Sequence, residues 1–141
     1  MTGEGAPLPT AHAPKPDKKY FTVEEANRAI AYVSRVADDV TATYARVVRL
    51  RRELTQADVA AGERLEASYE SAMDELAQLV DELQAVGVEL KDFERGLVDF
   101  PAVHEGREIL LCWQRGEREV SHWHEVEAGY AGRQPVDQLG D

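Results

Sequence analysis

The chain has 141 residues, the length of a single domain that is large enough to bury a hydrophobic core. Its 27 acidic and 16 basic side chains give a net charge of −11, which argues against binding to nucleic acid or to an anionic membrane surface. No apolar run approaches the roughly 20 residues that span a bilayer, no signal-peptide layout is present, and one cysteine excludes an intramolecular disulfide, so we expect a soluble cytoplasmic protein.

The first predicted elements are a disordered extension and a long helix. Residues 1–19 hold four prolines among glycine, alanine and lysine, and they have too little to bury to be ordered. Thr22 and Glu25 then form a capping-box pattern, in which each side chain accepts a hydrogen bond from the other residue's backbone N–H. An apolar stripe at alternating spacings of four and three follows and predicts an amphipathic helix. The stripe consists of Ala26, Ile30, Val33, Ala37, Val40, Tyr44 and Val47.

A second helix is predicted after a weak stretch at residues 55–62. Its stripe consists of Leu65, Tyr69, Met73, Leu76, Val80 and Leu83. Gly87 follows as a C-terminal stop, because glycine readily adopts the left-handed conformation that ends many helices. Two helices of similar length with a short break predict an antiparallel hairpin of coiled-coil character over residues 20–87. The alternative is one unbroken helix that pairs with a second chain. In either arrangement we expect a homo-oligomer that associates through the helices.

In the remaining ordered part, residues 88–136, the spacing of apolar residues no longer follows the helical period. Four short segments rich in branched and aromatic residues predict the strands of a small antiparallel meander. They are residues 88–92, 97–103, 107–113 and 119–126. The turns fall at His104–Gly106 and Arg115–Gly116, where glycine supplies the positive φ that such turns need. A sheet with one apolar face needs a cover, and the hairpin is the available one. The predicted fold class is therefore α+β, with residues 137–141 as a tail.

Several motifs of the second half resemble a known family. The opening YFTVEEAN and the runs GLVDFPA, REILLCW and WHEVEAGYAGRQP are similar to the uncharacterised bacterial family catalogued as domain of unknown function 2203 (DUF2203). The resemblance covers roughly residues 20–136 and implies a long helical region that leads into a small C-terminal module. In the family, the position of His122 more often holds an aromatic residue. The matching positions are Asp92, Gly96, Leu97, Asp99, Phe100, Trp113, Glu117, Trp123, His124, Gly129, Gly132 and Arg133.

One candidate site is a metal centre. His122 and His124 are two residues apart on a predicted strand, so both imidazoles point to the same side and could share a divalent metal with Asp99. Further candidate ligands are Glu125, His104 and Cys112. Whether Cys112 joins them depends on the register of the hairpin, because a slip of one residue turns it to the other face. The structural alternative is that His122 faces solvent and His124 is hydrogen-bonded inside the fold.

A second candidate is a small-ligand pocket formed by acids, a histidine, an arginine and an indole. Its residues are Asp92, Glu94, Asp99, Trp113, Glu117, His124 and Arg133. The histidine could exchange protons near neutral pH, and the arginine could hold an anion. The structural alternative is that Asp99 caps a turn and Arg133 pairs with a carboxylate to fix the tail.

Three functions remain compatible with the sequence. The first is a protein-interaction module that self-associates through its helices, with a protein partner as a further option and without nucleic acid or membrane. The second is a small-ligand pocket or enzyme around Asp99, His124 and Arg133. The third is a metal-binding protein. No motif in the sequence fixes a reaction, a substrate or a cofactor.

Overall fold

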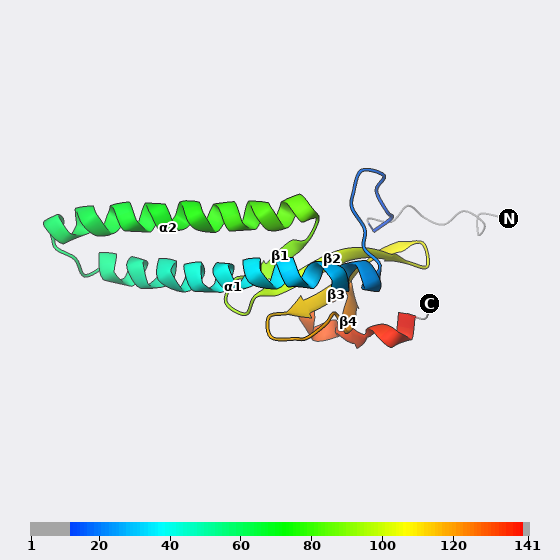
Figure 1. Cartoon of the computed structure of the whole chain (residues 1–141). Helices are drawn as coiled ribbons and strands as arrows, with labels where there is room; N and C mark the ends of the chain where they lie inside the picture. Colours follow the sequence, from blue (N-terminus) through cyan, green and yellow to red (C-terminus); the bar gives the residue numbers. More distant parts are fainter. Residues whose placement is uncertain (1–11, 140–141) are drawn as a thin grey trace.

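The structure is a computed structural model that describes residues 12–139. The chain folds into a helical hairpin followed by a five-stranded antiparallel sheet (Figure 1). The helices are α1 (Val23–Leu54) and α2 (Val59–Val86). The strands are β1 (Glu89–Asp92), β2 (Leu97–His104), β3 (Arg107–Gln114), β4 (His122–Glu125) and β5 (Gln134–Pro135), with 3-10 turns at Tyr130–Gly132 and Val136–Leu139. The predicted α+β architecture is confirmed.

The helix ends follow local sequence signals. Thr22 and Glu25 form the predicted capping box at the start of α1. Gly87 ends α2 with a φ of 94°, the left-handed conformation expected for a C-terminal glycine. Helix α2 begins within residues 55–62, the predicted break, because the Asp58 side chain accepts a hydrogen bond from the N–H of Ala61 and caps the helix there.

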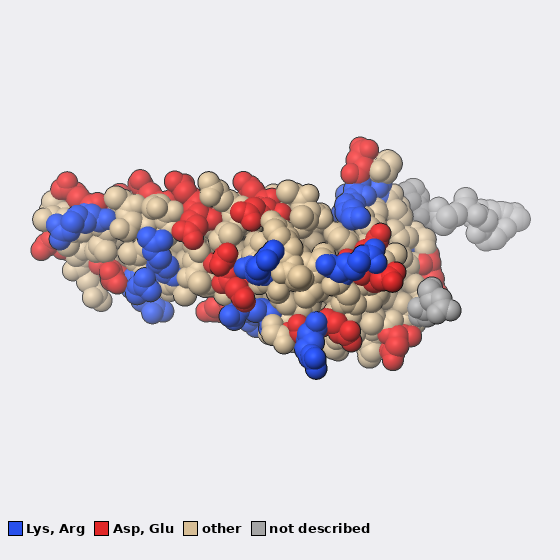
Figure 2. All heavy atoms as spheres, in the orientation of Figure 1, with Lys and Arg blue, Asp and Glu red and all other residues tan. Residues whose placement is uncertain are grey.

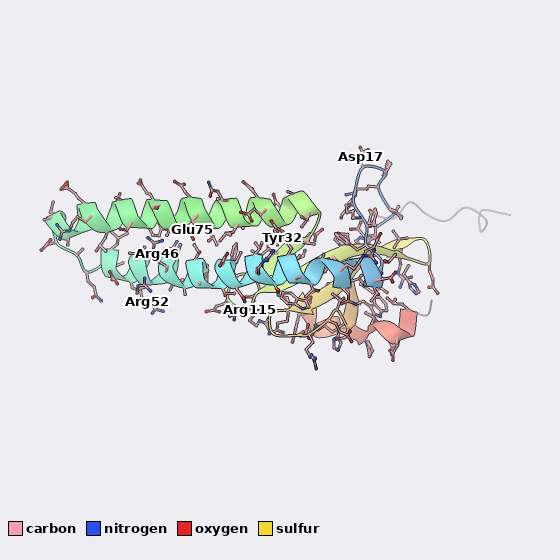
Figure 3. All side chains as sticks on the ribbon, in the orientation of Figure 1. Asp17, Tyr32, Arg46, Arg52, Glu75 and Arg115 are labelled. Atoms are coloured by element: carbon pink, nitrogen blue, oxygen red, sulfur yellow. The ribbon has the colours of Figure 1, made fainter. Side chains whose placement is uncertain are left out.

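The two helices pack against each other within one chain and extend beyond the sheet (Figure 1). Polar contacts join them along the hairpin: Arg46 lies 3.7 Å from Glu75, and both are labelled in Figure 3. Arg51, four residues after the last member of the apolar stripe, donates a hydrogen bond to the hydroxyl of Tyr69 at 3.0 Å. The intrachain hairpin is therefore the arrangement of the chain, and the single unbroken helix is not.

The sheet is a meander in the order β1-β2-β3-β4-β5. The side facing α1 contributes apolar residues to one continuous core with both helices, including Phe100, Leu111 and Trp113. Both predicted turns occur, with positive φ at Gly106 and Gly116. The connection from β3 to β4 runs on beyond Gly116, so β4 begins at His122 and not at residue 119. The two-residue strand β5 was not predicted.

The N-terminal segment packs along the sheet. The carbonyl of His12 accepts a hydrogen bond from the N–H of Glu108 at 2.7 Å. The Glu108 side chain is buried, forms an ion pair with Lys18 and accepts a hydrogen bond from the hydroxyl of Tyr20. Residues 12–19 thus make defined contacts, and the disordered extension that we expected over residues 1–19 is corrected for this part. Residues 1–11 lie outside the described part of the chain.

Candidate functional site

The register of the sheet brings several candidate side chains together on the face turned away from the helices. Asp99 on β2 lies opposite Cys112 on β3, and Cys112 lies opposite His122 on β4. Residues directly opposite in an antiparallel sheet point to the same side, and so do residues two apart on one strand. His124 therefore shares this face with Asp99 and Cys112. The register thus decides the open question of Cys112 in favour of the candidate site.

His124 is fixed by hydrogen bonds at both ring nitrogens. Its Nδ1 lies 2.7 Å from the backbone carbonyl oxygen of Glu125, so Nδ1 carries the proton, because a carbonyl oxygen can only accept. Its Nε2 lies 3.2 and 3.3 Å from the two carboxylate oxygens of Asp99. Both side chains are almost fully buried, with 3% and 2% of their surface exposed.

This surrounding makes His124 a strong base. The hydrogen bond with Asp99, and after it the hydrogen bond with Cys112, raise the pKa of His124 to about 10, although burial works in the opposite direction. Without a further cation, the imidazole is therefore protonated at neutral pH and forms a buried ion pair with Asp99. A buried pair of this kind needs both partners, since removing one leaves the other charge uncompensated.

Cys112 completes a group of three potential metal ligands. One ligand atom each from Asp99, Cys112 and His124 lies within 4.8 Å of the other two, and all three residues are buried. In a tetrahedral zinc site with bonds of roughly 2.0–2.3 Å, ligand atoms are about 3.5 Å apart. Side-chain shifts of about 1 Å would therefore bring the three atoms around one ion. Among residues 12–139, no second group of this kind is found.

A cavity of about 240 Å³ opens onto the buried pair. Asp99 and His124 form part of its wall, and Leu97, Leu110 and Val126 add apolar surface. The remaining wall comes from the turn between β1 and β2 and from the segment after β4, through Lys91, Asp92, Arg95, Gly129 and Tyr130. The pair is therefore buried from bulk solvent, yet it borders a space that a small molecule can occupy.

The turn at the mouth of this cavity is built around Asp92. Its Oδ1 accepts hydrogen bonds from the backbone N–H groups of Glu94 and Arg95 at 2.9 and 2.8 Å. The bond from Arg95, together with the nearby guanidinium, lowers the pKa of Asp92. The guanidinium of Arg95 lies 4.7 Å from the ring centre of Tyr130, a cation–π contact that orients it over the cavity wall.

Glu117 and Arg133 support the site from the side. Arg133 Nη2 donates to both carboxylate oxygens of Glu117, at 2.8 and 2.9 Å, and to the backbone carbonyl of Cys112 at 3.3 Å. The Glu117 carboxylate also accepts from the N–H of Gln114, and its backbone carbonyl accepts from the indole of Trp113. These contacts tie the C-terminal segment to β3 at the position of Cys112 and so hold that residue in place.

The structure brings together some of the residues that the sequence singled out and separates others. Asp99 and His124 meet, and Asp92 lies at the rim of the same cavity. His122 is outside the three-residue group, and its Nδ1 lies 3.0 Å from the hydroxyl of Ser121. Trp113 lies on the opposite, helix-facing side of the sheet in the apolar core.

Sequence reasoning missed three polar residues of the cavity wall: Lys91, Arg95 and Tyr130. Arg95 carries a local signal, because an aspartate three residues earlier is typical of a side-chain-capped turn. Tyr130 carries none, since its place beside Arg95 follows from the path of the segment after β4.

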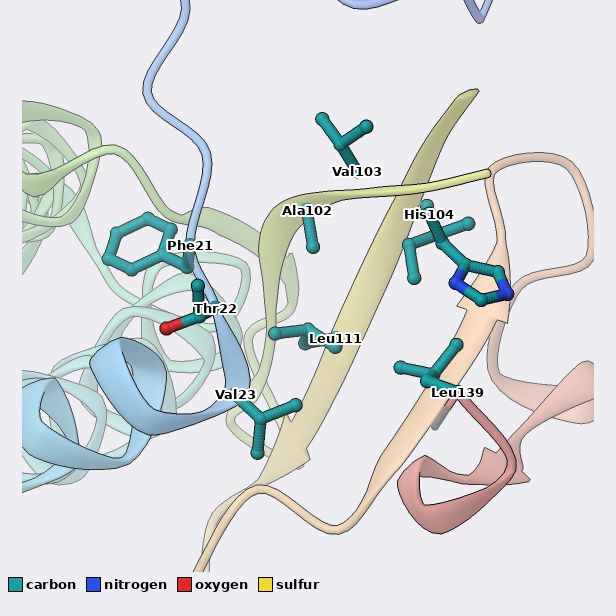
Figure 4. Close-up of a pocket in the computed structure, with 9 residues that line it drawn as sticks. Phe21, Thr22, Val23, Ala102, Val103, His104, Leu111 and Leu139 are labelled. Atoms are coloured by element: carbon teal, nitrogen blue, oxygen red, sulfur yellow. The ribbon is translucent and has the colours of Figure 1, made fainter. Parts of the chain in front are cut away.

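A second hollow lies on the other side of the sheet, where α1 begins (Figure 4). It has a volume of about 160 Å³ and is lined mainly by apolar side chains, among them Phe21, Val23, Leu111 and Leu139. Among residues 12–139, His104 is its only ionisable lining residue, and Figure 4 shows it at the edge of the hollow. It brings together no group of potential ligands comparable to that around His124.

Comparison with known proteins identifies a family but no function. The family described as "Uncharacterized conserved protein (DUF2203)" matches residues 19–136. No curated protein and no solved structure matches the chain. Within the described residues, neither helix is both long and apolar enough to cross a membrane.

Proposed function

The chain belongs to the DUF2203 family of uncharacterized conserved proteins, and from its own geometry we propose that it is a metal-binding protein whose ligands are Asp99, Cys112 and His124. The observation that carries the proposal is the convergence of three buried side chains of different ligand types beside a cavity. Cys112 takes the place that the sequence had suggested for His122 as the third ligand.

The orientation of His124 supports ligation. Its Nδ1 donates to a backbone carbonyl, the contact that commonly fixes the ring of a metal-bound histidine and leaves Nε2 free to ligate. A nucleophilic relay of cysteine, histidine and aspartate would need one ring nitrogen on the thiol and the other on the carboxylate. Here Nδ1 is already engaged, so Nε2 alone remains for Asp99, for Cys112 or for an ion.

The ligand types favour zinc or a chemically similar ion. Thiolate and imidazole are preferred ligands of zinc, whereas magnesium and calcium prefer oxygen alone. Three protein ligands leave the fourth position of a tetrahedral ion open, the arrangement typical of zinc sites that bind or activate a further molecule. The cavity beside Asp99 and His124 is where that position would be accessible.

The proposal is tested by native mass spectrometry of the untagged protein before and after addition of zinc, compared with the denatured mass. We expect one ion per chain. Cys112→Ser and His124→Gln should each abolish retention of the ion, because each removes one of three ligands. His122→Gln is the matched control: the residue is a histidine on the same strand and face, and it lies outside the group.

Circular dichroism should accompany each variant, so that loss of the ion is separated from loss of the fold. Asp99→Asn provides a second variant of nearly unchanged shape in case Cys112→Ser or His124→Gln fails to fold. A wild-type protein that retains no ion and is not stabilised by added zinc would refute the proposal. Equal loss of the ion in His122→Gln and His124→Gln would refute the ligand assignment.

A second candidate function is self-association through the hairpin. A mainly apolar groove of about 280 Å³ runs along α2, lined by Met73, Leu76, Ala77, Val80, Asp81 and Phe93, and Met73 and Phe93 are more than one-third exposed. Charge adds a complementary element. Helix α2 carries seven acidic side chains and one basic side chain, and Figure 2 shows acidic groups along its outer edge, whereas α1 carries six arginines against five acidic side chains. These features support an antiparallel pairing of α2 with α1 of a second copy.

Size-exclusion chromatography with light scattering tests the second candidate. We expect a dimer that Met73→Glu converts to a monomer, because the substitution places a charge in the apolar groove. Val59→Glu is the matched control, since Val59 is an exposed apolar residue of the same helix that is not part of this groove. A wild-type protein that remains monomeric at high concentration would exclude self-association.

A further inference from the structure

We infer that the cavity beside the proposed metal centre binds a small organic acid with a single negative charge, whose carboxylate lies between Arg95 and Lys91 while a neighbouring hydroxyl or carbonyl oxygen reaches the ion. This inference rests on the proposed function, because the ion supplies one of the two anchoring points. It goes further by naming the class of molecule that the site takes.

The cavity connects the two anchoring points. Its wall includes His124 and Asp99 at the buried end and Lys91 and Arg95 at the open end, so one small molecule can touch both. The volume of about 240 Å³ is below the roughly 300–1,000 Å³ typical of pockets for drug-sized ligands. The occupant is therefore small, with few atoms between its carboxylate and the oxygen that meets the ion.

The charge of the wall determines the charge of the ligand. A divalent ion is neutralised by the carboxylate of Asp99 and the thiolate of Cys112, since His124 ligates as a neutral imidazole. Among the described residues, the remaining charged groups of the wall are Lys91, Arg95 and Asp92, which together leave one positive charge. A single carboxylate matches that charge, and a doubly charged phosphate exceeds it.

Arg95 is suited to receive the carboxylate. Its guanidinium is oriented by the ring of Tyr130 at 4.7 Å and remains half-exposed. Its contact with Asp92 is long, at 3.4 Å, and the same carboxylate is already engaged by two backbone N–H groups. A planar guanidinium can donate two parallel hydrogen bonds to a carboxylate. Lys91 pairs with Glu89 in an exposed contact, the kind with which a bound anion competes readily.

The test uses glycolate, the smallest acid with a carboxylate and an adjacent hydroxyl, as the probe. Its binding to the zinc-loaded protein is measured by isothermal titration calorimetry, and its approach to the ion by the visible spectrum of the cobalt-substituted protein. We expect glycolate to bind and to change the cobalt spectrum, with weaker binding of acetate, which lacks the hydroxyl, and of phosphate, which carries the larger charge.

Arg95→Gln should weaken glycolate binding about tenfold, because it removes one charge-assisted contact, and should leave one ion per chain. Arg115→Gln is the matched control: Arg115 (labelled in Figure 3) is also half-exposed and also paired with an aspartate, Asp38 of α1, but it does not line the cavity. It should change neither glycolate nor zinc binding.

The outcomes separate this inference from the proposed function. A protein that binds zinc but shows neither heat nor a spectral change with glycolate overturns the inference and leaves the metal centre intact. Phosphate binding more tightly than glycolate overturns the assignment of a singly charged ligand. Equal effects of Arg95→Gln and Arg115→Gln overturn the assignment of the carboxylate position. A protein that binds no zinc fails at the proposed function itself.

Discussion

The buried pair of Asp99 and His124 predicts a specific dependence of stability on pH in the metal-free protein. The pKa of His124 is raised from the usual 6.5 to about 10 in the folded state, mainly by its hydrogen bond with Asp99. Between these two pH values the folded chain keeps a proton that the unfolded chain releases. The stabilisation is therefore complete below pH 6.5 and is lost as the pH rises towards 10.

The magnitude follows from this linkage. One extra bound proton in the folded state lowers the free energy of unfolding by about 1.4 kcal/mol for each unit of increasing pH. Between pH 7 and pH 9, the wild-type protein should therefore lose about 3 kcal/mol that is attributable to His124. Asp99→Asn removes the carboxylate that holds the proton while preserving the shape of the side chain, so this part of the pH dependence should largely disappear.

The assay is urea unfolding at pH 7 and pH 9 in the presence of a chelator, for wild type, Asp99→Asn and the control Asp38→Asn. Asp38 is also an aspartate with a cationic partner, but it is more than half exposed. The remaining ionisable groups are unchanged in all three proteins, so their contributions cancel in the comparison. If wild type and Asp99→Asn lost the same free energy between the two pH values, the buried ionic pair would be refuted.

Two further predictions concern the metal and the backbone. Binding of zinc at pH 7 should release about two protons per ion, one from Nε2 of His124 and one from the thiol of Cys112, because both must be deprotonated to ligate. Calorimetry in buffers of different ionisation enthalpy measures the number of protons released. A value near zero would contradict ligation by these residues. Gly87→Ala should destabilise the protein by about 1–2 kcal/mol, since φ is 94° and the new Cβ would lie 2.8 Å from Cγ of Lys19. Gly62→Ala should instead stabilise it by about 0.5–1 kcal/mol, because the position is helical and open; chemical denaturation of both variants checks the opposite signs.

The helices could be predicted from the sequence because their signals are local. The capping box at Thr22 and the stop at Gly87 involve residues within one turn of the helix end. Such patterns do not depend on the rest of the fold. Apolar periodicity places the start of α2 too late, because the Asp58 cap lies in a stretch that has no such periodicity.

The site could be predicted only in part, because strand pairing is not local. Alternation along β4 placed His122 and His124 on one side without any knowledge of the fold. The partner of His124, however, depends on the register across three strands, which is set by the turns between them. Alternation also separates Trp113 from its neighbour Cys112, so a site that contains Cys112 leaves Trp113 on the other side of the sheet.

The composition of the group around His124 also bears on whether the role of this buried group is structural or functional. Replacing a buried ion pair with apolar residues of similar volume is often neutral or stabilising, so stability alone gives little reason for Asp99 and His124 at the centre of a sheet face. The helix-facing side of the same strands shows the alternative, an apolar core built around Phe100, Leu111 and Trp113. The face with the carboxylate, the thiol and the imidazole borders a cavity and is held from the side by Glu117 and Arg133. A polar group that costs desolvation, is positioned by its surroundings and borders a cavity supports the proposed binding role over a purely structural one.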